Sequence, residues 1–373
     1  MKKLLLLLLL AQAFQLTAQA PHTHVPQRAI RFPDVPGYLT LVCDFHQHTV
    51  FSDGSVWPDI RVQEALRDSL DAISLTEHLE YQPHKGDIPH PDRNRSYEVA
   101  KDNARAYGLI VVKGSEITRR MPPGHSNAIF IQDANKLMIE DSIEVFREAK
   151  RQGAFTFWNH PNWTAQRPDG IARLTAMHLQ LIEEGLLDGI EVVNDLTYSD
   201  EALQIALDYN LTIMGTSDIH GLVDWQYGIP EGGHRPVTLA FATERSAEAI
   251  KDALLNRRTV VWYNNTLIGR EAQLVPLAEA SLSVAKAAYQ GPSSLAVVTV
   301  RNTSDVEYVL QSRSGYTFHT STGLVVLHPQ GETELQVKTL EQLKEFDLPF
   351  TVLNAVTAPN EHPDITLHVV IAQ

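Results

Sequence analysis

The sequence of 373 residues contains a single cysteine, Cys43, so no disulfide can form within one chain. Cys43 stands in an apolar run, which predicts a buried and unreactive thiol. Without a disulfide framework, stability must come from a packed core or from bound metal ions. A hydrophobic content of 43% and a charged content of 20% predict a sizeable core and exclude wholesale disorder.

Basic residues are also few, since 31 lysines and arginines stand against 45 acidic residues, for a formal net charge of −14. The sequence shows no basic patch, and an acidic surface repels phosphate backbones at long range. We therefore expect no stable nucleic-acid binding. A small phosphorylated ligand in a local site remains compatible with this composition.

Long apolar runs are absent after the N-terminus, which reads MKKLLLLLLLAQAFQLTAQA. Two lysines, a leucine run over residues 4–10 and the small-x-small end at residues 18–20 predict a signal peptide over residues 1–20. The leucine run is shorter than the about 20 residues that span a bilayer. We expect an exported protein, periplasmic or extracellular, with no membrane span after cleavage.

From about residue 38 to residue 264, short apolar runs alternate with longer stretches that have apolar residues at helical spacing. The runs predicted as strands are LTLVCDFH, DAISLTEH, LIVVKGSE, AFTFWNHP, GIEVVND, LTIMGTSDIH and VTLAFA. The predicted helices include DIRVQEALRDSL, SYEVAKDNARAYG, SIEVFREAKRQG and SDEALQIALDYN. This alternation predicts βα units and a parallel sheet, so we expect an α/β domain over residues 21–273.

After about Leu274 the texture changes to strand-like runs separated by turn residues, such as SSLAVVTVRNTS, TGLVVLHPQGETELQV and ITLHVVIAQ. Helical spacing almost disappears from this part of the chain. We therefore expect a small all-β sandwich over residues 274–373.

Metal-binding residue types stand where the predicted strands end. His46 and His48 close the first run, and residues i and i+2 of a strand point to the same face. Four further runs also end in His, Asp or Glu. The C-terminal ends of parallel strands in a (β/α) barrel meet at one face, so these side chains are expected to converge. Imidazole and carboxylate together favour Zn, Mn or Fe.

The ordered motifs HQHTVFSDG, TEH, GSE, GHSN, NHP and SDIH resemble the PHP family, named for polymerase and histidinol phosphatase. The resemblance covers roughly residues 40–265 and is nearest to exported phosphoesterases that carry an extra β domain. It implies a distorted (β/α)7 TIM-like barrel that holds two to three divalent metal ions. The sequence has TEH where TDH is commoner, but the changed residue precedes the ligand.

The resemblance also implies a role for each matching residue. One ion would be held by His46, His48, Glu116 and Asp218, a second by Glu116, His125 and His160, and a third by Asp53, His78 and His220. The catalytic residues would be Glu116, Asp218 and His220.

These motifs predict metal-dependent hydrolysis of a phosphomonoester or phosphodiester, with a metal-bound hydroxide as the nucleophile. Two alternatives stay open. One is an amidohydrolase-like enzyme acting on a C–N or carboxylic ester bond, and the other is a non-catalytic binding protein that contains metal.

Four arginines in the connecting loops are candidates for binding the phosphate, because guanidinium forms bidentate pairs with it. They are Arg93, Arg95, Arg119 and Arg235, and Arg120 lies beside the third of them. Tryptophans also stand near the strand ends, at residues 57, 158, 163 and 225, and could either stack a nucleotide base or pack the barrel rim. The expected partner is a small phosphorylated substrate, a nucleotide among the candidates, and a homo-oligomer is compatible with the sequence.

Overall fold

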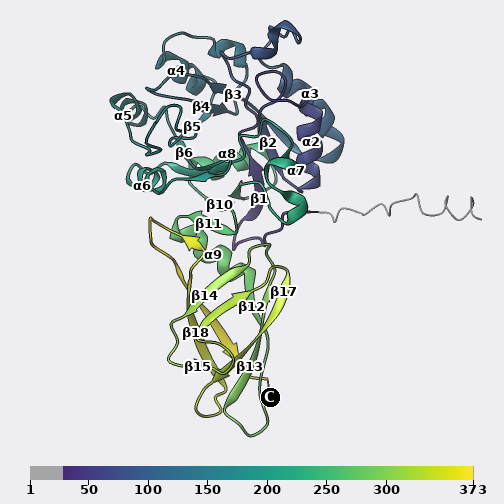
Figure 1. Ribbon diagram of the computed structural model, residues 1–373, viewed down its shortest axis with the longest axis vertical. Helices are drawn as coiled ribbons and strands as arrows, with labels where there is room; N and C mark the ends of the chain where they lie inside the picture. The colour runs from purple at the N-terminus through teal and green to yellow at the C-terminus, as the bar shows by residue number, and fades with distance from the viewer. Residues whose placement is uncertain (1–27, 373) are drawn as a thin grey trace, which may run out of the picture.

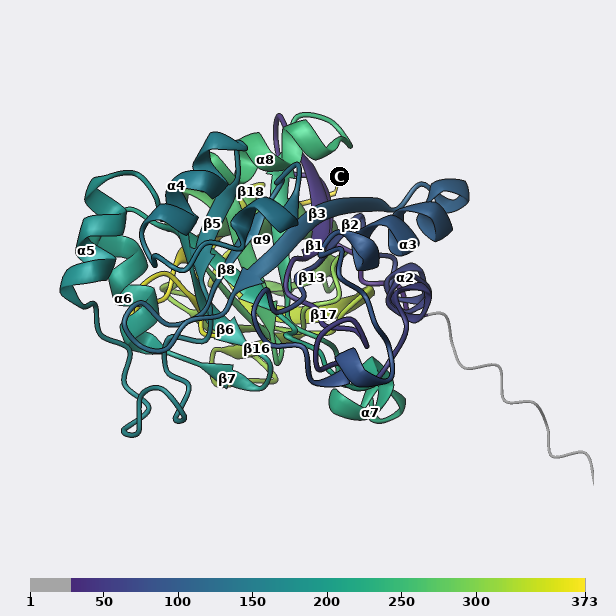
Figure 2. The same cartoon turned by 90° about the horizontal axis from the view of Figure 1, so that it is seen from above.

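A curled, mixed β-sheet forms the centre of the first part of the chain in the computed structural model, which describes residues 28–372 (Figures 1 and 2). Its strands are β1 (Leu39–Asp44), β2 (Ala72–Leu75), β3 (Ile110–Ile117), β4 (Ser126–Ile129), β5 (Phe155–Trp158), β6 (Gly189–Asn194), β7 (Thr197–Tyr198), β8 (Thr212–Thr216), β9 (Val237–Ala242), β10 (Thr259–Tyr263) and β11 (Thr266–Gly269). Their order in the sheet is β11-β10-β9-β1-β2-β3-β4-β5-β6-β7, and β8 pairs with β6. The expected α/β fold with a distorted barrel is confirmed.

Helices lie around this sheet, with α2 and α3 on one side and α4, α5 and α6 on the other (Figure 2). Their bounds are α2 (Pro58–Arg67), α3 (Arg95–Ala104), α4 (Glu144–Arg151), α5 (Ala176–Glu183), α6 (Asp200–Asp208), α7 (Val223–Gln226) and α8 (Ala247–Leu255). Short 3-10 helices cover η1 (Pro83–Gly86), η2 (Arg105–Tyr107), η3 (Ala134–Leu137) and η4 (Ile229–Glu231). No helix among residues 28–372 is long and apolar enough to span a bilayer.

The strands are buried on both faces, which explains their nearly continuous apolar sequences. Every residue of β2, β5, β6, β8 and β9 is buried, as is β1 after its first residue. Helices cover the outside and the strands' own side chains fill the inside, so an alternating pattern is not needed. Cys43 is fully buried in β1, as expected.

The strands do not all run in one direction. β1, β2 and β3 are parallel, and so are β5, β6 and β8, but β4 is antiparallel to both β3 and β5. β9 likewise runs antiparallel to β1. Because β4 is reversed, its N-terminal end lies beside the C-terminal end of β3. His125, which directly precedes β4, therefore meets Glu116 near the end of β3.

Side-chain hydrogen bonds join β8, which pairs with β6 in the sheet, to β9 and β10. The Thr238 hydroxyl of β9 donates to the Gly215 carbonyl (2.8 Å) and accepts from the Gly215 N–H (3.0 Å). The Thr259 hydroxyl of β10 donates to the Ile213 carbonyl (2.8 Å). A Cβ atom at Gly215 would collide with the Val261 side chain, so only glycine permits this approach.

The C-terminal part consists of two four-stranded antiparallel sheets packed face to face (Figure 1). One sheet contains β12 (Leu282–Tyr289), β13 (Leu295–Asn302), β17 (Gly331–Lys338) and β15 (Thr317–Phe318), and the other contains β16 (Leu324–Leu327), β14 (Tyr308–Ser312), β18 (Glu345–Val352) and β20 (Asp364–Val370). Exposed and buried residues alternate along β20, as expected for a strand with one face on the core.

Helix α9 (Glu271–Ser281) leads directly into β12. The expected boundary at residue 274 falls inside this helix. Leu274 and Leu277 are fully buried in a hydrophobic cluster that also contains core residues of the sandwich, so the helix packs with both domains. A second connection is β19 (Ala355–Val356), which pairs in parallel with β11. The expected signal peptide, residues 1–20, lies outside the described residues.

We expect replacement of Gly215 by alanine to lower the free energy of unfolding by about 1–3 kcal/mol, because the added methyl group overpacks the contact with Val261. Urea unfolding would measure the change. Gly86→Ala is the matched control, since a Cβ at Gly86 meets no heavy atom within 4 Å. Equal stability of the two variants would contradict this account of the close approach.

Candidate metal centre

The nine residues expected to bind metal gather at one end of the barrel. They come from the residues that follow β1, β2, β5 and β8, from β3 itself and from the residue before β4. Three overlapping groups have ligand atoms that all lie within 4.8 Å of one another. The groups are His48, Asp53, His78 and His220; His46, His48 and Glu116; and His78, Glu116 and His125.

The two histidines after β1 face the same point, as their spacing predicted. Their Nε2 atoms are 3.1 Å apart. One oxygen of Asp218 lies 3.0 Å from His46 Nε2 and 3.1 Å from His48 Nε2. Glu116 lies 3.5 Å from His46 and 3.8 Å from His48. These four side chains therefore surround one point, in the combination that the family resemblance implied.

Glu116 is fully buried and is contacted by histidines on several sides. His125 Nδ1 lies 3.1 Å and His160 Nε2 3.5 Å from the same carboxylate oxygen. His78 Nδ1 approaches the other oxygen at 2.5 Å. A carboxylate with two oxygens facing different sets of imidazoles has the geometry needed to bridge two cations.

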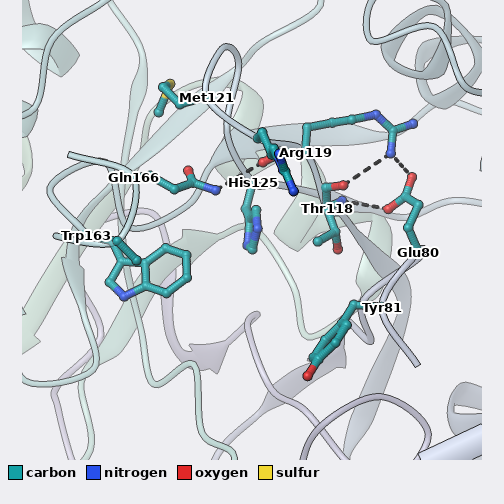
Figure 3. Close-up of a pocket in the computed structure, with 10 residues that line it drawn as sticks. Glu80, Tyr81, Thr118, Arg119, Met121, His125, Trp163 and Gln166 are labelled. Carbon is teal, nitrogen blue, oxygen red and sulfur yellow. Dashed lines mark hydrogen bonds and ion pairs between the residues drawn. The ribbon is translucent and has the colours of Figure 1, made fainter. Parts of the chain in front are cut away.

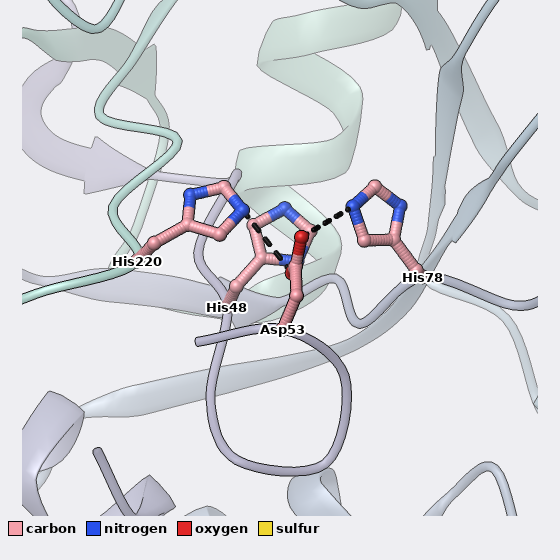
Figure 4. Close-up of side chains that lie close together, drawn as sticks. All are labelled: His48, Asp53, His78 and His220. Atoms are coloured by element: carbon pink, nitrogen blue, oxygen red, sulfur yellow. Dashed lines mark ion pairs between the residues drawn. The ribbon is translucent and has the colours of Figure 1, made fainter. Parts of the chain in front are cut away.

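His48, Asp53, His78 and His220 form a group at the outer edge of the centre (Figure 4). The Asp53 carboxylate lies between two rings, 3.1 Å from His220 Nε2 and 3.3 Å from His78 Nε2. The His220 side chain is 41% exposed, whereas His46 and His48 are fully buried. This edge is therefore the most exposed part of the centre.

The pKa values of the two histidines after β1 move in opposite directions. Burial alone would lower the pKa of His46, but the carboxylates of Asp218 and Glu191 raise it to about 10. Burial and the neighbouring His220 lower the pKa of His48 to about 3. Without a metal ion, one ring is therefore protonated at neutral pH and the other is neutral.

The pKa values of Glu116 and His78 are likewise shifted in opposite directions. Burial would raise the pKa of Glu116, but His78 and His125 hold it well below its usual range. Burial would likewise lower the pKa of His78, yet Glu116 and Asp53 raise it to about 11. The centre thus keeps its carboxylates ionised and carries protons that a divalent cation can replace.

The residues fit a divalent cation by a direct structural criterion. Glu116 Oε2, Asp53 Oδ1 and Asp218 Oδ1 are buried and accept no regular hydrogen bond from a backbone, hydroxyl or amide donor of the described chain, but each lies within 3.1 Å of a histidine ring nitrogen. Buried carboxylates surrounded by imidazole nitrogens are costly to keep without a balancing charge, and a divalent cation between them would supply it. Buried imidazoles and carboxylates are the donor set of Zn, Mn and Fe sites.

Several residues hold the ligands in place but were not predicted as site residues. Glu191 accepts from His46 Nδ1 (2.8 Å) with one oxygen and from the His160 N–H (2.7 Å) with the other. Asn159 donates to Glu116 (2.7 Å), and Asn194 donates to Asp218 (3.2 Å). Glu191 lies in the middle of β6 and Asn194 is its last residue, so polar residues within the buried run GIEVVND were the available signal.

A relay of hydrogen bonds also orients His48. The Ser52 hydroxyl lies 3.1 Å from His48 Nδ1 and donates to Glu77 (2.5 Å). Glu77 also accepts from the N–H (3.1 Å) and the hydroxyl of Thr49. This glutamate, the variable residue of the TEH motif, therefore fixes the loop that carries Asp53 and leaves His48 Nε2 directed at the centre.

The four arginines expected to bind phosphate differ in position. The prediction for Arg235 is wrong, because its guanidinium is fully buried and pairs with Asp44 (3.2 Å) and Asp68 (2.8 Å). Arg93 donates to the Leu79 and His90 carbonyls. Arg95 is exposed at the first residue of α3.

Arg119 lines a pocket beside the centre, but its guanidinium already pairs with Glu80 and donates to the Ile139 carbonyl (2.5 Å). Arg120 lines the same pocket and is exposed. Of these two neighbours, Arg120 is the one with a guanidinium open to a ligand.

A curled α/β barrel whose strand ends carry clustered His, Asp and Glu side chains belongs to the class of metal-dependent hydrolases. The chain is 42% identical to a two-domain protein of Bacteroides vulgatus ATCC 8482 that contains a predicted PHP-like metal-dependent phosphoesterase. That crystal structure superposes with a TM-score of 0.85, over 92% of this chain and 99% of the other. The chain therefore belongs to the same PHP-like family, as its motifs indicated.

The β domain has a family assignment of its own. A family model described as an Ig-like domain matches residues 282–368, which begin at the first residue of β12. The chain is also 35% identical over 82 residues to an uncharacterized protein, MJ1295, of Methanocaldococcus jannaschii. That match covers 21% of this chain and 34% of the relative, so the chain spans about a third of the curated relative's length.

We expect replacement of Ser52 by alanine to weaken Zn²⁺ binding about 10–100-fold, because His48 loses the hydrogen bond that orients its ring. Competition with a chelator would measure the affinity. Ser96→Ala, which removes a buried hydroxyl from α3, is the matched control and should bind Zn²⁺ like the unaltered protein. Unchanged affinity in Ser52→Ala would contradict the role of the relay.

Proposed function

We propose that the protein hydrolyses a phosphoester, either a monoester or a diester, with two to three divalent ions of Zn, Mn or Fe as cofactors. The observation that carries the proposal is Glu116, a fully buried carboxylate whose two oxygens face separate groups of histidines. A bridging carboxylate suits a multinuclear site, and paired metal ions are typical of phosphoester-cleaving enzymes.

The metal ions would be held by His46, His48, Asp53, His78, Glu116, His125, His160, Asp218 and His220. Bound there, they would neutralise phosphate oxygens and lower the pKa of water. The protein supplies a rigid frame for this chemistry, because Glu191, Asn159 and Asn194 fix the ligands from behind.

We assign three residues to the reaction itself. Glu116 has oxygens facing both ligand groups, and one oxygen of Asp218 lies within 3.1 Å of both His46 and His48. His220 donates from Nδ1 to the Asp218 carbonyl (2.7 Å), which leaves Nε2 directed toward Asp53 and the accessible edge. His220 has the most exposed side chain of the nine residues, at 41%.

A phosphoester is favoured over an amide or a carboxylic ester for two reasons. The relative from Bacteroides vulgatus is named as containing a predicted phosphoesterase. In addition, the exposed guanidinium of Arg120 lines the pocket that contains His125, and guanidinium is suited to an anionic substrate.

We propose that the protein acts outside the cytoplasm, on the basis of its first 20 residues. Fractionation of cells that produce the full chain, with mass spectrometry of the N-terminus, should find the protein in an exported fraction and cleaved after residue 20. A cytoplasmic protein with an intact N-terminus would contradict export.

We expect the double replacement of His46 and His48 by alanine to lower phosphate release by about 10³-fold or more. The reason is that losing several kcal/mol of metal-supplied stabilisation corresponds to that factor. Assays with p-nitrophenyl phosphate, its bis-ester and an amide panel would measure it, alongside elemental analysis.

His328→Ala is the matched control, because His328 is an exposed histidine of the β domain that pairs with Glu307. This variant should keep full activity and metal content. Full activity of the double variant without bound metal would contradict the proposal, and turnover of amides alone would favour the amidohydrolase alternative.

A further inference from the structure

An open pocket of about 790 Å³ adjoins the metal centre (Figure 3). His125 forms part of its wall, and so does Thr118, whose hydroxyl lies 2.8 Å from His78 Nδ1. The pocket is therefore lined by one of the histidines that surround Glu116 and by a residue in contact with another. Its volume is that of a site for a small organic molecule and far exceeds the space a phosphate group needs.

Trp163 presents an aromatic face to this pocket. The backbone N–H of Trp163 donates to the His160 carbonyl (2.9 Å), so the turn after the NHP motif fixes the Trp163 backbone next to a metal-binding histidine. The ring centroid lies 5.1 Å from that of His160 and 5.7 Å from that of His125. The residue is nevertheless 45% exposed, which leaves ring surface free.

Tyr81 provides a second exposed ring in the same pocket. Its ring lies edge-on to His78 with centroids 5.7 Å apart, and the residue is 51% exposed. Figure 3 shows Tyr81 and Trp163 on opposite sides of His125. A single exposed aromatic residue is common on protein surfaces. Two exposed rings that flank one metal-binding histidine form a paired surface for a ligand.

Two polar side chains of the wall, Arg119 and Gln166, are already engaged by the protein. Arg119 pairs with Glu80, and the Gln166 amide donates to the Arg119 carbonyl (3.0 Å). These bonds give the pocket a fixed frame, whereas the rings of Trp163 and Tyr81 keep free surface. The free surface of the wall therefore combines these two rings with the exposed guanidinium of Arg120.

We propose that the group esterified to the phosphate carries a flat, unsaturated ring that stacks on Trp163, with Tyr81 on the other side. The proposal rests on the proposed function, because it places the phosphate at the metal centre. Stacking of a flat ring on an aromatic side chain strengthens binding by about tenfold or more. A saturated ring of the same size lacks the π-face and should not gain this factor.

Phenylphosphonate and cyclohexylphosphonate test the proposal, because they match in size and charge and their C–P bond is not a phosphoester. Calorimetry with the Mn²⁺-loaded full chain should find that phenylphosphonate binds about tenfold more tightly. The preference should disappear in Trp163→Leu and be largely retained in Trp163→Phe. Methylphosphonate should bind both variants and the unaltered protein equally, because it reports on the metal centre alone.

Trp225→Leu is the matched control, since Trp225 is 82% exposed on α7 and is not among the residues that line the pocket. It should keep the preference for phenylphosphonate. Equal binding of the two ring compounds, or a preference that survives Trp163→Leu, would overturn the inference while binding of methylphosphonate upheld the metal centre. If none of the three compounds binds, both the inference and the proposed phosphoester function fail.

Discussion

The burial of the Glu116 carboxylate is the constraint on which the site depends. Removing a carboxylate from water is costly unless charged or hydrogen-bonded partners replace the solvent. Here the partners are imidazoles from several strand ends and the amide of Asn159. They must come from segments that are far apart in sequence, and the curl of the sheet brings those segments together. The same carboxylate that is unfavourable to bury alone becomes the common ligand of the centre.

The same principle explains the layer beneath the centre, where Arg235 is also buried with its counter-ions. Its guanidinium joins Asp44, at the end of β1, to Asp68, directly after α2. Asp44 in turn accepts from the hydroxyl (2.6 Å) and the N–H (3.1 Å) of Ser217, the residue before Asp218. Arg235 therefore supports the loop that carries a metal-binding carboxylate, and its charge is unavailable to a substrate.

Sequence patterns correctly predicted the features that depend on local backbone geometry. The i, i+2 spacing of His46 and His48 determines that both face one point, and the apolar runs correspond to β1, β2, β3, β5, β6, β8 and β9. The reversed direction of β4 could not be predicted in this way, because it depends on pairing with β3 and β5. The burial of Arg235 could not be predicted either, because a position in a loop does not reveal burial and both counter-ions are more than 150 residues away in the sequence.

The exact junction between the two domains is not marked in the sequence, for a related reason. Helix α9 is buried along a face that the barrel and the sandwich share, and β19 adds a strand of the C-terminal part to the barrel sheet. No polar linker marks such a junction. The change in composition near residue 274 therefore shows that an all-β domain follows, but it does not identify the residue at which the barrel core ends.

The β domain contacts the barrel at a different place from the metal centre. The Arg31 N–H donates to Asp305 (2.7 Å), so the sandwich contacts the segment that enters β1, whereas the metal centre lies after the last residue of that strand. The pocket beside the centre is lined by residues 80–81, 118–121, 125, 163 and 165–166, all of them from the barrel. Strand ends fix the ligands, and the loops after β2, β3 and β5 form the wall of the pocket beside the centre. Such a division allows the loops to change with the substrate while the strands keep the metal centre intact.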